Sequence, residues 1–189
     1  MSNLILPALE ESEIIPDVLP VEFKTTQFKG TLDITYPNGD KVLLGNDITP
    51  ENSSARPTIV FNPNANSSFT YENKKFILIM TDPDAPSRTD KKYSEVCHMI
   101  ECDVELIPGK PINGTVMNSY IGPGPPKGAG KHRYIFLLFD QNVKGETLKK
   151  VENYICWGYN EQGVGVDKWI KENGINDLLA VNFFYAENK

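Results

Sequence analysis

The chain has 189 residues, a mass of 21.2 kDa and a formal net charge of −6, from 19 basic and 25 acidic residues. This length fits one domain, or one domain with a terminal appendage, and the acidic balance argues against a nucleic-acid-binding protein, which needs a basic face. The sequence contains two histidines, His98 and His132, which excludes a zinc site built on three histidines.

The acidity is concentrated at the N-terminus. Residues 1–22 hold five acidic side chains and neither Lys nor Arg, which leaves 20 acidic and 19 basic residues for positions 23–189. We therefore predict an acidic N-terminal extension over residues 1–22 and a main domain over residues 23–189. Within the extension, Pro7, Pro16 and Pro20 limit residues 3–19 to one or two short helical turns.

The pattern at the N-terminus does not resemble a signal peptide, because no basic region precedes the apolar stretch and Pro7 and Glu10 interrupt it. The longest apolar runs, such as 134–139, are far too short to span a membrane. Three cysteines, an odd number, form no disulfide framework. Together these features predict a reduced, cytoplasmic protein without a transmembrane segment.

Short strands dominate the main domain. Alternating apolar and polar residues at 31–36 precede the turn sequence Pro37-Asn38-Gly39-Asp40 and a return at 41–44, which predicts a hairpin. Such a series predicts a mainly β fold, an antiparallel β-sandwich with a few short peripheral helices. The remaining strands are expected at 58–61, 69–71, 76–80, 96–106, 117–121, 134–139 and 178–185, and helices at 143–154 and 164–173.

Both histidines adjoin buried strands. Asp82 and Asp84 follow the strand 76–80, His132 immediately precedes the strand 134–139, and His98 is expected on the even-numbered, apolar face of the strand 96–106. If the strands 76–80 and 134–139 are antiparallel neighbours, these four side chains converge at one rim of the sheet.

The residue types at this rim suit a small anion. A carboxylate orients an imidazole and raises its pKa, and the glycine-rich segment 122–130 offers unobstructed backbone N–H groups. The cations expected around such a pocket are Arg88, Lys127, Lys131 and Arg133.

Other interpretations use the same residues. A histidine on an apolar strand face is more often a hydrogen-bonded core residue than a ligand, and Asp-Pro-rich runs are good turn sequences in their own right. Two histidines and a carboxylate also suit a metal-dependent hydrolase, although His98 and His132 are 34 positions apart. A cysteine nucleophile is disfavoured, because Cys97 and His98 are adjacent on a strand and point to opposite faces.

Two separated segments resemble signatures of the phosphatidylethanolamine-binding protein family. The first is Thr81-Asp82-Pro83-Asp84-Ala85-Pro86-Ser87-Arg88, followed by Ser94-Glu95-Val96-Cys97-His98. The second is Gly122-Pro123-Gly124-Pro125-Pro126-Lys127-Gly128, which runs into Gly130-Lys131-His132-Arg133-Tyr134. Further along, Trp157-Gly158-Tyr159 and the stretch 169–173 look similar to the fungal branch of the family, which includes the yeast carboxypeptidase Y inhibitor.

The resemblance implies a non-enzymatic binding protein without a cofactor, whose pocket accepts phosphate or a phospholipid headgroup. It also implies inhibition of a serine carboxypeptidase of the carboxypeptidase Y type through the N-terminal segment. The alternative within the family is a phospholipid- or phosphoprotein-binding regulator of kinase signalling, with signalling proteins or a peripheral membrane contact as partners. On this sequence the implied pocket residues are Asp82, Asp84, Pro86, His98, Gly124, Pro126, His132 and Tyr134, and the implied partner-binding residues are Ser2, Asn3, Leu4, Ile5 and Leu6.

Within the pocket, we expect His98 and His132 to donate N–H groups to the anion, with Asp82 orienting one of them and the Tyr134 hydroxyl as a further donor. Asp84 either shares this role or fixes its loop by accepting backbone N–H bonds. If the N-terminal segment carries the inhibition, truncation of residues 1–20 should abolish it and leave the fold intact.

Overall fold

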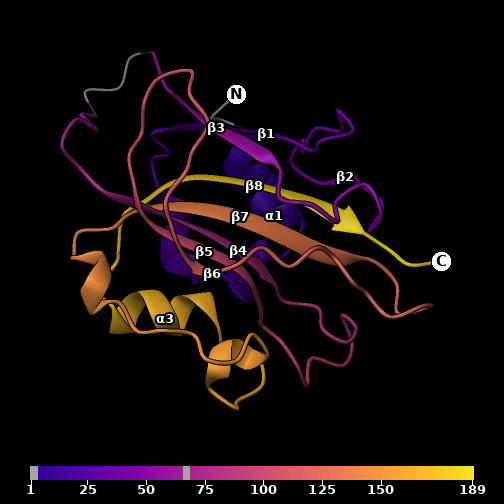
Figure 1. Ribbon diagram of the computed structural model, residues 1–189. Helices are drawn as coiled ribbons and strands as arrows, with labels where there is room; N and C mark the ends of the chain where they lie inside the picture. Colours follow the sequence, from indigo (N-terminus) through magenta and orange to yellow (C-terminus); the bar gives the residue numbers. More distant parts are fainter. Residues whose placement is uncertain (1–3, 66–68) are drawn as a thin grey trace.

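The fold is built on one six-stranded sheet, accompanied by a two-stranded sheet (Figure 1). The computed structural model describes residues 4–65 and 69–189. Its described strands are β1 (Gly30–Thr35), β2 (Asn46–Asp47), β3 (Thr58–Pro63), β4 (Phe76–Asp82), β5 (Val96–Val104), β6 (Thr115–Asn118), β7 (His132–Asp140) and β8 (Leu178–Ala186). The large sheet has the order β2-β8-β7-β4-β5-β6, with all neighbours antiparallel except β2 and β8, and the small sheet pairs β1 with β3.

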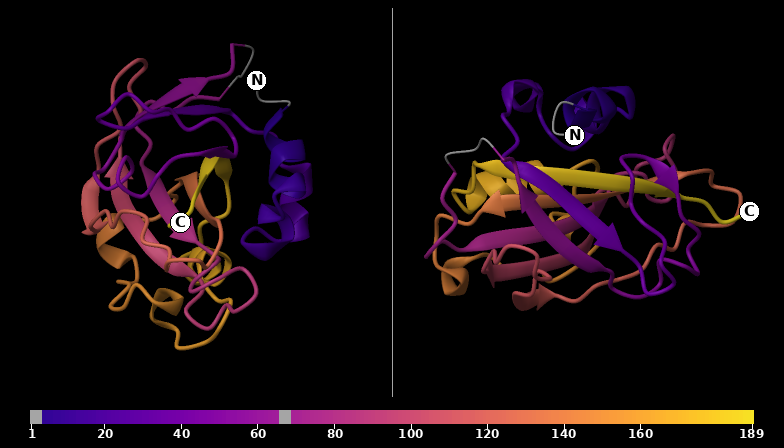
Figure 2. Two further views of the ribbon diagram at one scale, coloured as in Figure 1. Left: turned by 90° about the vertical axis from the view of Figure 1, so that its right-hand side faces the viewer. Right: turned by 90° about the horizontal axis from the view of Figure 1, so that it is seen from above.

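Short helices lie at the periphery of the sheets (Figure 2). In the described chain, no helix is long and apolar enough to cross a membrane. The mainly β architecture with short peripheral helices confirms the predicted fold class. The helical elements are α1 (Ile5–Glu11), α2 (Ile14–Asp17) and α3 (Val166–Glu172), with 3₁₀ turns η2 (Val21–Thr25), η3 (Gly145–Thr147) and η4 (Cys156–Gly158).

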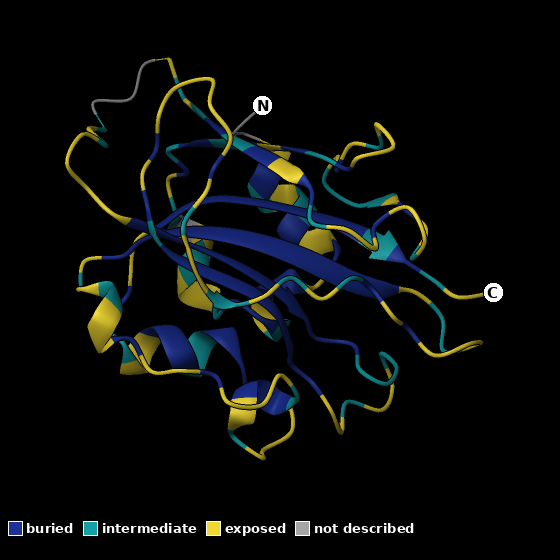
Figure 3. Cartoon of the chain, viewed as in Figure 1, coloured by how far each residue is buried: buried dark blue, intermediate teal, exposed yellow. Residues whose placement is uncertain are grey.

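Apolar side chains form one hydrophobic cluster on each face of the large sheet. All seven residues of β4 are buried, with Ile77 and Ile79 facing the first cluster and Leu78 and Met80 facing the second. The first cluster also includes side chains of α1, α2 and α3, and the second includes those of β1 and β3. The uninterrupted apolar run of β4 therefore results from coverage on both faces, which is visible as the buried centre in Figure 3.

The N-terminal segment packs into the first cluster. Ile5 and Leu9 lie one helical turn apart on the buried side of α1, and Ile14, Val18 and Leu19 continue the contact. The predicted boundary at residue 22 therefore separates two parts of the chain that share one hydrophobic core.

The acidic side chains of this segment also bind cations of the main domain. Glu10 pairs with Lys24 at 2.8 Å, Glu13 with Arg88 at 2.6 Å, and Asp17 with both Lys91 and Arg133. The charge imbalance seen in the sequence is thus partly compensated within the fold.

Four predicted elements differ in the structure, and one of them, the strand expected at 117–121, forms at 115–118 as β6. The turn at 37–40 forms, with the Tyr36 N–H donating to the Asp40 carbonyl at 2.8 Å, but the return at 41–44 shrinks to a single bridge, Thr35 to Lys41. The chain then bends at Leu44 and Gly45, both with positive φ, to place β2 beside β8, and β3 becomes the partner of β1. The stretch 69–71 is not a strand, and its aromatic rings pack over the second cluster.

The predicted helix at 143–154 is wrong, since only the short turn η3 forms there. Leu148 and Val151 are buried against the first cluster, and the backbone bonds to side chains of other elements. The Lys149 N–H donates to Asn173 Oδ1 at 2.9 Å, and the Val151 carbonyl accepts from Asn118 Nδ2 at 3.0 Å. These tertiary bonds replace the helical ones. The helix at 164–173 is confirmed as α3, and it ends before Gly174, whose φ is +69°.

Candidate functional site

The predicted juxtaposition of Asp82 with the histidines is present. Because β4 and β7 are antiparallel neighbours, with Thr81 opposite Ile135, the end of β4 lies beside the start of β7. Asp82 Oδ2 is 2.8 Å from His132 Nδ1 and 4.0 Å from His98 Nε2. One buried carboxylate therefore lies between the two imidazoles.

His98 reaches this place through a β-bulge. Met80 is paired with Met99 and Thr81 with Cys97, so His98 is the extra residue on β5. The expectation that His98 shares an alternating face with Ile100 and Cys102 is wrong, because the bulge breaks the alternation. The His98 ring instead meets Tyr134 edge-on, with the ring centroids 5.2 Å apart.

A cavity of about 250 Å³, the histidine pocket, opens at this rim. Apolar and aromatic side chains form most of its wall, and Tyr93, Ile121 and Tyr154 are exposed at its edge. Seven of the eight predicted pocket residues line it, and Asp84 does not. The lining residues are Asp82, Ala85, Pro86, Tyr93, Val96, His98, Ile121, Gly122, Gly124, Pro126, His132, Tyr134, Tyr154 and Ile155.

His132 uses both ring nitrogens within the protein. Nδ1 lies 2.8 Å from Asp82 Oδ2, and Nε2 lies 3.0 Å from the carbonyl oxygen of Pro86. Burial lowers the pKa of His132, but the hydrogen bond and charge of Asp82, aided by the Pro86 carbonyl, outweigh it and leave the pKa raised. Both nitrogens face oxygen acceptors, so the protonated ring satisfies both contacts.

His98 is in a different state. Its Nδ1 lies 2.7 Å from the Ile121 carbonyl oxygen, which only accepts, so Nδ1 carries the proton. Burial lowers the pKa of His98 more than the nearby Asp82 charge raises it. The neutral ring therefore presents the lone pair of Nε2.

Tyr134 completes the floor of the pocket. Its hydroxyl interacts with the Asp82 carboxylate and with the Gly124 backbone N–H, and burial followed by the Asp82 charge raises its pKa. The phenol ring stacks on Phe184, with centroids 5.3 Å apart. Tyr134 is thus a fixed, protonated hydroxyl within the wall.

Asp84 lies behind the pocket wall and binds Arg133. Both side chains are fully buried, and Asp84 accepts bonds from the backbone N–H, Nε and Nη2 of Arg133 at 2.6 to 2.9 Å. These contacts connect the loop that carries Asp84 to the start of β7.

Arg133 also holds the N-terminal segment. Its Nη1 donates to the carbonyl oxygens of Ser12 and Glu13, and its Nη2 contacts Asp17 at 2.8 Å. Sequence reasoning placed Arg133 around the pocket and missed this contact. The available indication was a single arginine inside a strand that is otherwise buried throughout, which requires an acidic partner.

The other expected cations do not line the pocket. Arg88 pairs with Glu13 and Lys131 with Asp47, and Lys127 is exposed on its loop. Among the described residues, no group of three or more His, Cys, Asp or Glu side chains is arranged to hold a metal ion.

The predicted partner-binding residues divide into three groups. Ser2 and Asn3 lie outside the described residues. Leu4 is 64% exposed, which leaves it accessible to a partner. Ile5 is 1% exposed and Leu6 is half-buried, and both pack against the first cluster.

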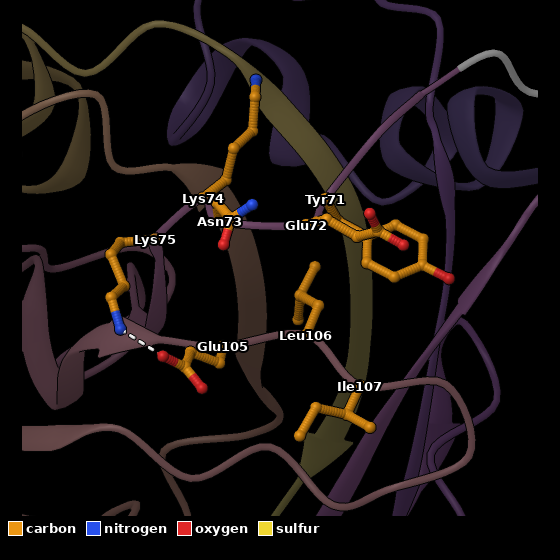
Figure 4. A pocket seen from close by; sticks show the side chains of 8 residues that line it. All are labelled: Tyr71, Glu72, Asn73, Lys74, Lys75, Glu105, Leu106 and Ile107. Atoms are coloured by element: carbon orange, nitrogen blue, oxygen red, sulfur yellow. Dashed lines mark hydrogen bonds and ion pairs between the residues drawn. The ribbon is translucent and has the colours of Figure 1, made fainter.

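A larger hollow of about 510 Å³ lies away from the histidines, and Figure 4 shows its side chains. Lys75 points toward Glu105 and pairs with it at 2.5 Å, whereas Lys74 points away and pairs with Asp140 at 2.7 Å. Both lysines are thus neutralised by partners of the same chain, and the hollow offers no unpaired cation for an anionic ligand.

The family model for phosphatidylethanolamine-binding protein matches residues 33–184. The chain belongs to the phosphatidylethanolamine-binding protein family. The matched range includes every strand of the structure from β2 to β7 and all the residues that line the histidine pocket.

Two relatives of this chain come from Saccharomyces cerevisiae. The uncharacterized protein YLR179C is 44% identical over 196 residues, covering 100% of this chain and 96% of the relative. Carboxypeptidase Y inhibitor is 38% identical over 190 residues, covering 86% of each protein.

A solved structure of carboxypeptidase Y inhibitor, complexed with its cognate proteinase, matches with a TM-score of 0.91 and 36% identity. The alignment covers 100% of this chain and 97% of the inhibitor. This family member therefore shares its architecture along the whole described chain.

Proposed function

We propose that this protein is a non-enzymatic, cytoplasmic binding protein that inhibits a serine carboxypeptidase of the carboxypeptidase Y type through its N-terminal segment. The same protein binds a small anion, phosphate or a phospholipid headgroup, in the histidine pocket. The two activities use different surfaces, because Leu4 does not line the pocket.

The observation that carries the inhibitory role is the likeness over the full chain to an inhibitor that forms a complex with its proteinase. Two features of the N-terminal segment support the same role. Leu4 is an exposed apolar side chain suited to a partner, and the residues that follow are fixed by burial and by Arg133. A partner-binding residue on a rigid support loses little conformational entropy on binding.

The test is inhibition of carboxypeptidase Y by the full chain and by Leu4→Asp. Val116→Asp is the matched control, because Val116 on β6 is 58% exposed and equally apolar. We expect Leu4→Asp to weaken inhibition at least tenfold and Val116→Asp to leave it unchanged, with both variants folded by circular dichroism. Equal inhibition by the full chain and Leu4→Asp would remove Leu4 from the interface.

Deletion of residues 1–20 is unsuitable for this test. It would remove six buried aliphatic side chains from the first cluster, each stabilising the fold by about 1.5–3 kcal/mol. The total, about 9–18 kcal/mol, equals or exceeds the whole stability of a typical domain. We therefore no longer expect the truncated chain to keep its fold, and the test uses single substitutions of exposed residues instead.

A kinase-signalling role is the alternative, and it predicts that partner binding depends on the histidine pocket and not on Leu4. Substitutions in the histidine pocket would change binding to a phosphorylated partner, and Leu4→Asp would not. Measuring both variants against both partners separates the two functions.

A further inference from the structure

The histidine pocket lacks an unpaired positive charge. None of its lining residues is Lys or Arg. The His132 ring is paired with the Asp82 carboxylate at 2.8 Å, so a protonated His132 is already compensated, and the buried Arg133 is bound by Asp84 and Asp17 behind the wall. An anion that enters this pocket meets no net positive charge. Its binding is therefore strongly unfavourable without a compensating change, because transfer of an isolated anion from water costs free energy.

His132 is also unavailable as a donor, because both of its nitrogens already face protein oxygens. The nitrogen that remains is Nε2 of His98, since Nδ1 donates to Ile121. Within the described part of the chain Nε2 makes no hydrogen bond; its nearest carboxylate oxygen, on Asp82, is 4.0 Å away, beyond hydrogen-bond distance. Nε2 becomes a donor only after it takes up a proton.

The groups that face His98 act on this proton uptake in opposite directions. Asp82 on β4 favours a charged His98, and His132 on β7 opposes it. Tyr134 on β7 is a protonated hydroxyl, and the other polar groups of the pocket wall include the Ile121 carbonyl and the phenols of Tyr93 and Tyr154. An anion in the cavity adds a second negative neighbour to Asp82, which shifts the balance toward the imidazolium form.

We propose that the histidine pocket binds its anion together with one proton, which is held on His98 Nε2, while His132 stays a structural partner of Asp82. This inference rests on the proposed anion-binding function and specifies its ligand chemistry. Phosphate and a headgroup phosphodiester share the required acceptor oxygens, but a diester has no acidic proton to bring in this pH range. For the diester the proton must come from water.

Calorimetric titration of the full chain tests this proposal. The probes are inorganic phosphate and glycerophosphoethanolamine, measured from about pH 5 to pH 8 in two buffers of different ionisation enthalpy. We expect glycerophosphoethanolamine to bind with uptake of about one proton, so that its affinity falls about tenfold per pH unit above the His98 pKa. The probe that binds with the higher affinity shows whether the anion of this pocket is free phosphate or a phospholipid headgroup.

Two variants assign the proton. His98→Gln keeps a side-chain amide donor without a titratable group, so binding should lose its pH dependence. His132→Gln should keep the pH dependence, whatever its absolute affinity. Loss of pH dependence in His132→Gln and its retention in His98→Gln would overturn the assignment.

Nitrogen NMR of the ligand-free protein gives a readout that does not require binding or a variant. At neutral pH, His98 should show a protonated Nδ1 and an unprotonated Nε2, and His132 should show two protonated nitrogens. The opposite His98 tautomer, or diester binding without proton uptake, would overturn this inference alone. Absence of binding by either probe at any pH would overturn the proposed pocket function as well.

Discussion

Arg133 joins the pocket loop to the N-terminal segment, and its replacement is expected to weaken both. Arg133→Met removes the partner of Asp84 at a site where both side chains are fully buried. The Ser12 and Glu13 carbonyl oxygens lose their donor as well. The substitution nearly conserves volume, so the effect comes from lost polar contacts.

The loss of stability expected for Arg133→Met follows from the Asp84 carboxylate, which is left buried without a partner. Breaking a buried ion pair by removing one partner costs about 3–5 kcal/mol, because the other charge stays buried without compensation. For a chain of this size, a loss of that order lowers the melting temperature by roughly 6–20 °C. Asp17 contributes less to this loss, since its side chain is 26% exposed and it keeps Lys91 at 2.9 Å.

Chemical denaturation of Arg133→Met, Asp84→Asn and the double variant measures the contact. The double variant should lose less than the two single losses combined, because one uncompensated group disappears with the other, with a coupling of about 1–3 kcal/mol. Carboxypeptidase inhibition by Arg133→Met should weaken, since the segment that follows Leu4 is less firmly held. A loss of stability below about 1 kcal/mol in Arg133→Met would refute the assigned role.

Two further predictions concern buried groups. Burial raises the pKa of Glu95 from 4.5 to about 8, so the native state keeps a proton that the unfolded chain loses. The free energy of unfolding therefore falls as pH rises from about 4.5 to about 8, by at most about 5 kcal/mol. Glu95→Gln should flatten this pH dependence in urea titrations. A Glu95→Gln profile parallel to that of the wild-type chain would show that Glu95 is already ionised. Leu9→Ala in α1 should cost about 2–5 kcal/mol, whereas Leu4→Ala should change stability by less than about 0.5 kcal/mol; equal losses would mean that α1 is not packed as described.

The strands that carry the site were predictable because their burial is complete. The runs at 76–80 and 134–139 contain only apolar residues, which requires cover on both faces. The Asp-Pro segment ends the first run, and the glycine-rich segment 122–130 precedes the second. From these two strands alone, the meeting of Asp82 with His132 could be inferred. The local sequence was enough to predict a strand wherever an uninterrupted apolar run was bounded by clear turn residues.

The failures arose where distant contacts decide the local conformation. At 143–154 the helical spacing of apolar residues was real, but Asn118 and Asn173 bind the backbone groups that a helix would use. The bulge at His98 depends on the register between β4 and β5, which no residue of β5 specifies by itself. The state of His132 likewise depends on the Pro86 carbonyl, 46 positions away in the chain.

Titration of carboxypeptidase Y with the full, folded chain tests the proposed inhibition most directly. At enzyme concentrations well above the dissociation constant, we predict that activity falls linearly and reaches its minimum near one equivalent of the chain. Undiminished activity in the presence of a large excess of folded chain would contradict the proposed function.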